Sequence, residues 1–280
     1  FGEPPKAARK HHEHNHHGIV VQDPYAWLQD PNYPTVNDQE ILDYLRDENT
    51  YFEQYMAPNR ELVDTLFKEL KARKSDSDES VPYFHNGYHY QWRFNEGDQY
   101  RRWYRAAGSH EHEQIDPRDW VTLLDENALA TDQDYFRLGA MSVSPNNQFI
   151  AYSIDTDGGE RFTLHVIDLT NGIAVTSPIT HTIGEAIWNQ HSDGLLYRHV
   201  NDQWRPDKIY WRKLHDDQAD TLICAEEDGG FFLSMHLSQS EQLVFLRSAD
   251  HVTSEVSYLP IDDFSACLLY TSDAADDVIS

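Results

Sequence analysis

A literal zinc-protease motif lies near the start of the chain. His12, Glu13 and His16 fit the pattern H-E-x-x-H, in which two histidines bind zinc and the glutamate acts on the metal-bound water. That chemistry needs both histidines on one face of a buried helix. Here the motif has no apolar neighbours to bury it, and Ile19 stands where the extended form requires glycine. We therefore expect a solvated stretch without a metal site, although a histidine-site metalloprotein stays an alternative. Adventitious Zn or Ni binding would use His11, His12, His14, His16 and His17.

The thirteen glycines exclude several catalytic and cofactor-binding motifs. Their spacing contains no G-x-G dinucleotide loop, no G-x-S-x-G nucleophile elbow and no P-loop. Cys224 and Cys267 are too far apart in sequence for a C-x-x-C metal site. No serine nucleophile can be identified. We therefore assign no catalytic, cofactor-binding or metal-binding residue in this chain, and we expect no cofactor.

Clusters of acidic and aromatic residues have structural explanations. Residues 76–79, 216–217 and 226–228 are rich in carboxylates but lack the D-x-D-x-D-G loop of a calcium site, so we expect solvated turns. Alternating aromatic residues are more often the packing face of a sheet than a ligand cage. The residues concerned are Tyr88, Tyr90, Trp92 and Phe94.

The overall charge argues against two classes of partner. The 280 residues include 48 acidic and 22 basic ones, a formal net charge of −26. Such a surface repels nucleic acid and anionic lipid, so we expect neither partner. No apolar run approaches the ~18 residues of a membrane span, and the N-terminus shows no signal peptide, although one could have preceded it. Two cysteines make no disulfide framework, which favours the cytoplasm and leaves the periplasm open.

The first part of the chain has the periodicity of helices. Apolar residues over 41–56 recur at helical spacing, and Asn37 with Glu40 resembles a capping box before them. A Pro-Asn pair breaks this run, and residues 62–70 then carry a tighter apolar stripe. The charged stretch 71–80 has few apolar residues. We expect two helices there, followed by a linker and a domain boundary.

After residue 80 the apolar period changes to that of strands. Residues 88–94 and 100–105 flank a turn and predict a hairpin. Three stretches, 143–152, 188–197 and 237–246, share a polar turn followed by a four-residue apolar strand, and they recur at intervals of 45 and 49 residues. A four-stranded unit recurring at about 40–50 residues is typical of β-propeller blades. We therefore predict a propeller, the alternative being a β-sandwich with accidental spacing.

Several motifs together indicate a family. Asp23-Pro24-Tyr25-Ala26-Trp27-Leu28 combines aromatic residues with prolines that predict a bent, anchored loop. Asn86-Gly87-Tyr88-His89-Tyr90, Glu96-Gly97 with Tyr100, and Thr253-Ser254-Glu255-Val256 follow in order. From about residue 4 to 264 the chain resembles the N-terminal part of the oligopeptidase B group, in the prolyl oligopeptidase family of serine peptidases. The last three motifs favour that group over prolyl oligopeptidase itself.

The resemblance implies a fold and a division into domains. The fold would be mainly β, a partial seven-bladed β-propeller of about four blades preceded by an N-terminal helical segment. Residues 1–75 would be the segment that packs on an α/β-hydrolase domain, which this chain would lack. Residues 80–266 would be the incomplete propeller. Residues 267–280 depart abruptly from the family pattern and resemble a translated sequencing adapter, so we expect a non-native tail.

The resemblance also implies a function for a longer parent protein. It would be a serine-type endopeptidase that hydrolyses short peptides after Lys or Arg, with the propeller limiting substrate size. Its Ser-Asp-His triad would lie beyond this chain, so we expect the chain itself to be inactive. Partners would be short basic peptides and the hydrolase domain in cis. The alternatives are a stand-alone propeller that binds or scaffolds other proteins, and a peptidase with prolyl oligopeptidase-type specificity.

Overall fold

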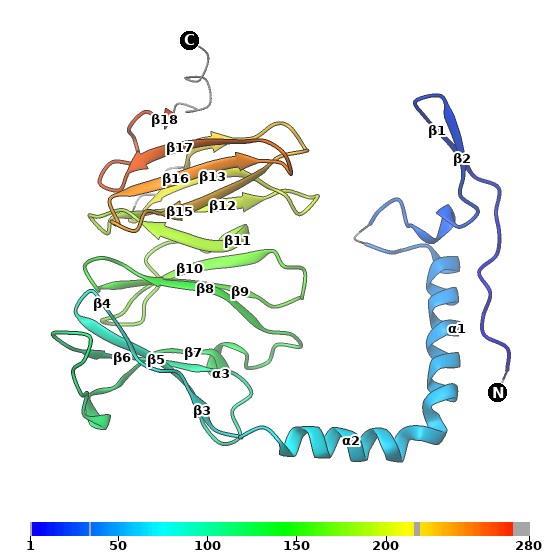
Figure 1. Cartoon of the computed structure of the whole chain (residues 1–280), viewed down its shortest axis with the longest axis horizontal. Helices are drawn as coiled ribbons and strands as arrows, with labels where there is room; N and C mark the ends of the chain where they lie inside the picture. Colours follow the sequence, from blue (N-terminus) through cyan, green and yellow to red (C-terminus); the bar gives the residue numbers. More distant parts are fainter. Residues whose placement is uncertain (1, 34, 216–218, 271–280) are drawn as a thin grey trace, which may run out of the picture. The chain divides into compact units, whose positions relative to one another are not determined.

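The structure is a computed structural model that describes residues 2–33, 35–215 and 219–270. The chain divides into two compact units, which we call unit 1 (residues 1–75) and unit 2 (residues 76–280). Unit 1 contains the two long helices and unit 2 contains most of the strands (Figure 1).

Unit 1 begins with a short hairpin and continues into two helices. Its elements are β1 (Glu13–His16), β2 (Ile19–Gln22), the 3-10 helix η1 (Ala26–Leu28), α1 (Gln39–Met56), the 3-10 turn η2 (Ala57–Asn59) and α2 (Arg60–Ala72). Pro58 lies in η2, where its ring prevents one straight helix from continuing. Figure 1 shows α1 and α2 running in different directions on either side of this break.

The start of α1 differs from the expected capping box by one residue. Asp38, not Asn37, is the N-cap, and its carboxylate accepts a hydrogen bond from the backbone N–H of Glu40 at 2.8 Å. The backbone N–H of Asn37 instead donates to the carboxylate of Asp30 at 2.7 Å. The prediction of Asn37 as cap was therefore wrong, because the helix begins one residue later and Asp38 supplies the side-chain acceptor.

Unit 2 consists of four groups of antiparallel strands in its described residues, which we call blades 1 to 4 (Figure 1). Blade 1 holds β3 (Asp78–Glu79), β4 (Tyr83–His85), β5 (Tyr88–Phe94), β6 (Arg102–Ala107) and β7 (Val121–Asp125), with η3 (Pro117–Asp119) before β7 and α3 (Glu126–Leu129) after it. Blade 2 holds β8 (Arg137–Val143), β9 (Phe149–Asp155), β10 (Phe162–Asp168) and the first half of β11 (Ile179–Trp188). Blade 3 holds the second half of β11, β12 (Gly194–Val200), β13 (Pro206–Lys213) and β14 (Thr221–Ala225). Blade 4 holds β15 (Phe232–Leu237), β16 (Leu243–Ala249), β17 (Ser254–Pro260) and β18 (Leu269–Tyr270).

One bent strand joins blades 2 and 3. The first half of β11 pairs with β10, and its second half pairs with β12, with the register shifting between Thr182 and Ala186. Gly184 lies at this bend with a φ of +98°. A Cβ atom there would lie 2.8 Å from the hydroxyl oxygen of Ser153, so the site requires glycine both for its backbone conformation and for space.

Hydrophobic clusters occupy the interfaces between successive blades. Between blades 1 and 2 the buried residues are Tyr90, Leu123, Leu124, Ile150 and Tyr152. Between blades 2 and 3 they are Ala151, Leu164, Val166, Ile179, Trp188, Leu195, Tyr197 and Leu214. Between blades 3 and 4 they are Leu196, Ile209, Leu233, Met235, Val244, Leu246, Leu259, Ile261 and Phe264. In β9 and β12 adjacent residues therefore face opposite interfaces, as Ile150 and Ala151 do, which is the pattern of stacked blades.

Arginine side chains also cross these interfaces. Arg105 of blade 1 donates to the carbonyl of Asn147 at 3.2 Å, and Arg198 of blade 3 donates to the carbonyl of Leu233 at 2.9 Å. At the interface between blades 2 and 3, the Arg161 guanidinium lies 3.9 Å from the centre of a tryptophan ring in blade 3. Main-chain carbonyls at the blade edges thus gain charged donors from the neighbouring blade.

The structure explains the internal repeat of the sequence. Ser144, Asn189 and Ser238 each open a four-residue turn, and the side-chain oxygen of each accepts backbone N–H groups at the start of the next strand. The fourth residue of each turn, Asn147, Ser192 or Glu241, has a φ of 56–60°. The predicted β-propeller fold of about four blades is confirmed, and the β-sandwich alternative is wrong.

The end of the described chain falls in the segment expected to be a non-native tail. Leu269 and Tyr270 form the short strand β18, which pairs with Tyr258 and Ser257 of β17. Residues 271–280 lie outside the described residues. The non-native origin of residues 267–280 stays a prediction.

Candidate functional site

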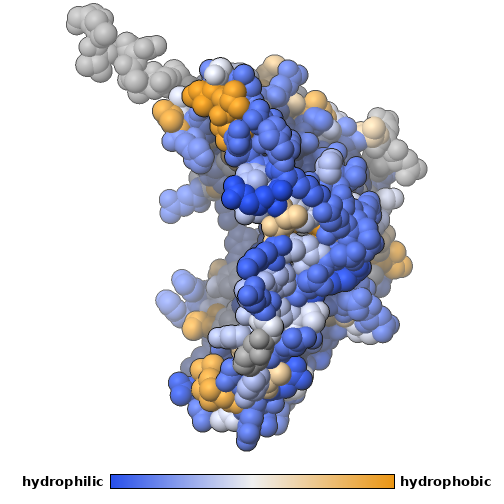
Figure 2. Space-filling view, turned by 90° about the vertical axis from the view of Figure 1, so that its right-hand side faces the viewer, coloured by the Kyte–Doolittle hydropathy of each residue, from blue (hydrophilic) through white to orange (hydrophobic). Residues whose placement is uncertain are grey.

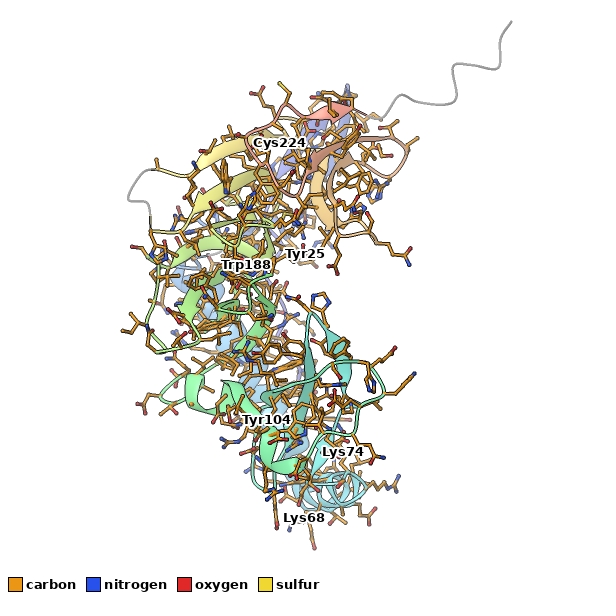
Figure 3. The ribbon with its side chains drawn as sticks, turned by 90° about the vertical axis from the view of Figure 1, so that its left-hand side faces the viewer. Tyr25, Lys68, Lys74, Tyr104, Trp188 and Cys224 are labelled. Atoms are coloured by element: carbon orange, nitrogen blue, oxygen red, sulfur yellow. The ribbon has the colours of Figure 1, made fainter. Side chains whose placement is uncertain are left out.

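A cavity of about 790 Å³ lies where the first turns of the four blades meet, and we call it the turn cavity. Its wall includes His85 and Asn86 from blade 1, Gln190 from blade 3, and Glu241 with Asp262 from blade 4. The inner strands supply an apolar part, which includes the indole of Trp188. Figure 3 shows Trp188 among the side chains in the middle of the stacked blades.

Hydrogen bonds connect the turns around this cavity in chain order. The side-chain amide of Asn86 donates to the carbonyl of Pro145 at 2.6 Å, and the amide of Asn147 donates back to the carbonyl of Asn86 at 3.1 Å. The backbone N–H of Asn146 then donates to the hydroxyl of Ser192 in blade 3 at 3.0 Å. The rim of the turn cavity is therefore held by contacts between blades.

The rim continues to blade 4 and returns to blade 1. The backbone N–H of Gln190 donates to the carbonyl of Ile261 at 3.0 Å. The imidazole Nδ1 of His85 lies 3.8 Å from a carboxylate oxygen of Glu241, so these side chains attract one another when the histidine is protonated. Both are more than half exposed, which limits that attraction.

The turn cavity has the groups of a binding site. Its lining includes two serines, Ser142 and Ser240, and one imidazole, His85. The hydroxyl of Ser240 lies 3.1 Å from the hydroxyl of Ser238 in the neighbouring part of the same turn. Amides, carboxylates and an indole suit a peptide, which offers main-chain donors and acceptors with mixed side chains.

A second cavity, of about 570 Å³, lies between blades 1 and 2 at the other end of their inner strands. Tyr83 and Leu138, at the starts of β4 and β8, line it, whereas His85 at the end of β4 lines the turn cavity. We call it the Glu126 pocket after Glu126, a residue that is 7% exposed. Burial raises the pKa of Glu126, while the hydrogen bond from Trp103 and the charge of Arg101 act in the opposite direction.

The H-E-x-x-H motif lies on strand β1, with His12 directly before the strand, and not on a helix. His12, His14 and His16 alternate with other residues and lie in a row, with ring centres 5.1 Å and 5.5 Å apart. The two histidines of the motif therefore lack the helical arrangement that a zinc protease needs. Among residues 2–33, 35–215 and 219–270, no group of three or more His, Cys, Asp or Glu side chains is placed to hold a metal ion.

The loop that carries the family motif is held by its own side chains. The indole N–H of Trp27 donates to the carbonyl of Ala8 at 2.7 Å, and the Lys10 ammonium lies 4.4 Å from the centre of the Trp27 ring. The Asp30 carboxylate accepts backbone N–H groups of Asn32, Asn37 and Asp38, and these bonds lower the pKa of Asp30. The motif thus has a structural role in unit 1.

The other residues singled out from the sequence also have structural partners. Tyr90 packs in the cluster between blades 1 and 2, with Tyr88 beside it. The Glu226 carboxylate accepts hydrogen bonds from the backbone of Asp228 and from the hydroxyl of Ser248 in blade 4. Both cysteines are free thiols. The acidic pair 216–217 lies outside the described residues.

Comparison with known proteins identifies the fold family. The family model described as "Prolyl oligopeptidase, N-terminal beta-propeller domain" matches residues 4–273. The chain belongs to the prolyl oligopeptidase family. Within this family it is similar to "Protease 2" of Moraxella lacunata, with 28% identity over 278 residues that cover 98% of this chain and 39% of that protein. It is also similar to "Dipeptidyl aminopeptidase BI" of Pseudoxanthomonas mexicana, with 30% identity over 276 residues, 92% of this chain and 37% of that protein.

Solved structures in the prolyl oligopeptidase family share the fold. Oligopeptidase B from Leishmania major aligns with a TM-score of 0.86 at 22% identity, over 96% of this chain and 39% of that one. Oligopeptidase B from Trypanosoma brucei aligns with a TM-score of 0.83 at 23% identity, over the same shares. The chain thus spans about two fifths of the length of the relatives that it matches.

Sequence reasoning missed both cavities. The turn cavity is formed by residues from the first turns of four blades and from the turn after β17, which lie up to 177 positions apart, from His85 to Asp262. The repeated turns were a signal that these segments share one end of the propeller, but the curvature that brings them together was not predictable from their spacing.

Among the described helices, none combines the length and apolar character needed to cross a bilayer.

Proposed function

We propose that this chain is the propeller part of a serine oligopeptidase that hydrolyses short peptides after Lys or Arg. The match of the family propeller model to residues 4–273 carries the proposal. The similarity to a protein named Protease 2 and to two oligopeptidase B structures supports the choice within the family. Hydrolysis would proceed by attack of an activated serine on the peptide carbonyl, followed by hydrolysis of the acyl-enzyme.

The role proposed for the propeller is to admit peptides and exclude folded proteins. The turn cavity provides a space of about 790 Å³, which accommodates a short peptide segment and no folded domain. Its rim is held by hydrogen bonds between blades, so widening it requires several bonds to break together. The peptidase would work on substrates that reach a serine supplied by the hydrolase part of the same enzyme.

The charge of the chain supports a preference for basic peptides. The net charge of −26 attracts cationic peptides over distances comparable to the Debye length, which raises their rate of association. Figure 2 shows hydrophilic residues over most of the face that it presents, with apolar residues in separate patches. We therefore expect kcat/KM for basic peptides to fall as salt is added, and a salt-independent value would contradict this role of the charge.

The test is a series of fluorogenic peptides that differ only in the residue before the scissile bond. The intact enzyme that carries this propeller is assayed with Arg, Lys, Pro and Ala at that position, with and without a serine-directed phosphonate. We expect hydrolysis after Arg and Lys, and its loss on phosphonate treatment. Hydrolysis only after Pro would show that the specificity is for proline and not for basic residues. If none of these peptides is hydrolysed in a phosphonate-sensitive way, the proposal is overturned.

A second candidate is removal of dipeptides from a free N-terminus. The 30% identity to a protein named dipeptidyl aminopeptidase favours it. The same peptides with an acetylated N-terminus distinguish the two activities. Cleavage of the blocked peptides supports an endopeptidase, and cleavage of the free forms alone supports the dipeptidyl aminopeptidase.

A further inference from the structure

The Glu126 pocket has an unusual composition for a cavity between two propeller blades. Its carboxylate belongs to Glu126, the first residue of α3. One oxygen accepts a hydrogen bond from the indole N–H of Trp103 at 2.7 Å. Within the part of the chain that the structure describes, Glu126 forms no ion pair with Lys, Arg or His, and its other oxygen accepts no hydrogen bond. This second oxygen is not one of the fully buried polar atoms that lack a partner, so it stays accessible and is available to accept a donor from a ligand.

Aromatic rings make up much of the wall around this carboxylate. Tyr83, Phe94, Tyr100 and Trp103 all line the pocket. The faces of aromatic rings attract cations, and the attraction is strongest where water is excluded. A carboxylate beside several rings is the combination that binds an ammonium or guanidinium group, because the ion pair and the rings act on the same cation. A planar guanidinium fits such walls best, since it can also stack on a ring.

The one arginine in the lining leaves the carboxylate available. The Arg101 guanidinium lies 4.7 Å from the centre of the Trp92 ring, and the backbone carbonyl of Arg101 accepts a hydrogen bond from the backbone N–H of Glu126 at 3.1 Å. Its side chain makes no ion pair with Glu126 in the described residues, although its charge acts on that carboxyl from a distance. Arg101 is exposed, so its charge is largely screened by solvent.

We propose that the Glu126 pocket binds the guanidinium group of an arginine in a peptide. The proposal deepens the proposed function, on which it rests for the source of that peptide, by assigning part of the recognition of basic substrates to the propeller itself. The bound arginine would form an ion pair with the free oxygen of Glu126 and stack against the aromatic wall. Trp103 would hold the other oxygen in place.

Binding can be measured on the chain of residues 1–280 by calorimetric titration. The probes are N-acetylarginine methylamide and its citrulline counterpart, which has the same shape without the charge. We expect the arginine compound to bind more tightly, and Glu126→Gln to weaken it about tenfold, because glutamine still accepts the Trp103 hydrogen bond but carries no charge. The matched control Glu96→Gln, at an exposed carboxylate in the neighbouring turn, should leave binding unchanged.

The Trp103 indole N–H provides a readout that needs no variant of Glu126. Its NMR signal is assigned by its absence in Trp103→Phe, and it should shift with arginine compound and not with citrulline compound. Equal binding of the two compounds, or equal binding to wild type and folded Glu126→Gln, would overturn the proposal. An unmoved Trp103 signal during binding would do the same.

Kinetics of the intact enzyme then separate this proposal from the proposed function. Peptides with arginine or citrulline at a position away from the cleaved bond are compared. Glu126→Gln should raise KM about tenfold for the arginine peptide alone and leave kcat unchanged. If the chain binds arginine but the intact enzyme hydrolyses none of the peptides, the proposed function is refuted and the proposal that the Glu126 pocket binds arginine is retained. Hydrolysis with an unchanged KM in Glu126→Gln would refute the role of the pocket in substrate recognition.

Discussion

The apolar residues of α2 and those of the blade interfaces are alike in type and different in burial. Leu62, Leu66, Phe67 and Leu70 on α2 are 47–65% exposed, and α2 contains no buried residue. In contrast, Leu246 between blades 3 and 4 is 2% exposed. A periodic apolar pattern therefore predicts a secondary structure and a face, but whether that face is covered depends on what packs against it.

The two regions should respond differently to the same deletion of side-chain atoms, which gives the largest expected effect. Leu246→Ala removes a buried side chain and leaves a cavity, so we expect it to lower the free energy of unfolding by about 2–5 kcal/mol. Leu66→Ala removes a side chain that is 47% exposed, and alanine favours helices, so we expect a change of about 0.5 kcal/mol or less. Urea unfolding followed by circular dichroism measures both. Equal losses would mean that α2 is as tightly packed as the blades.

The joint between blades 2 and 3 offers a sharper comparison within unit 2. Gly184→Ala places a methyl group 2.8 Å from the Ser153 hydroxyl at a positive φ, so we expect the free energy of unfolding to fall by about 2 kcal/mol. Gly172 also has a positive φ, +72°, but its Cβ would meet open space. Gly172→Ala should therefore cost about 1 kcal/mol, from backbone strain alone. Equal losses in the same unfolding experiment would show that the blade joint is not closely packed around Gly184.

Acid should weaken the loop after β9 through Asp155. Burial alone would raise the pKa of Asp155, but backbone N–H groups of Asp157, Gly158 and Glu160 bond to its carboxylate and together hold the pKa below its ordinary value. A carboxyl with a lower pKa in the folded state stabilises it fully above the unfolded value of about 3.9, and this stabilisation is lost as pH falls through the folded value.

Asp155→Asn tests this dependence. At low pH we expect it to lower the free energy of unfolding less than the other substitutions in unit 2 do. At pH 7 we expect the free energy of unfolding of the variant to be about 2 kcal/mol lower than that of wild type, because the amide replaces one acceptor by a donor. The difference from wild type should stay constant down to about pH 5 and shrink below about pH 4. Asp134→Asn, at an exposed carboxylate, is the control. A difference that grows on acidification would contradict the assigned direction of the pKa shift.

The blades were predictable because local signals agreed with one another. The turns opened by Ser144, Asn189 and Ser238 repeat one pattern of polar side chain and left-handed residue, and each is followed by a strand that carries buried apolar residues. The spacing of these turns then favoured a propeller over a sandwich. At the start of α1, by contrast, Asn37 and Asp38 are both good caps, and the local sequence does not show that the carboxylate of Asp38 is the one that accepts the first helical N–H.

The cavities were not predictable from the sequence because they depend on contacts distant in the chain. His85 and Glu241 come near one another through the curvature of four stacked blades, and the repeated turn that contains Glu241 gives no sign of this pairing. Glu126 was one carboxylate among 48 acidic residues, and only its burial beside Trp103 distinguishes it. A motif search also highlighted His12 and His16, which the structure places directly before and at the end of strand β1 and not on a helix.

The central claim is that the propeller admits peptides and excludes folded proteins. The most direct measurement compares one arginine-containing sequence as an eight-residue peptide and as a surface loop of a stably folded protein, both incubated with the intact enzyme. Mass spectrometry follows cleavage at the arginine. The account predicts cleavage of the peptide and none of the folded protein, and equal rates of cleavage for both substrates would contradict it.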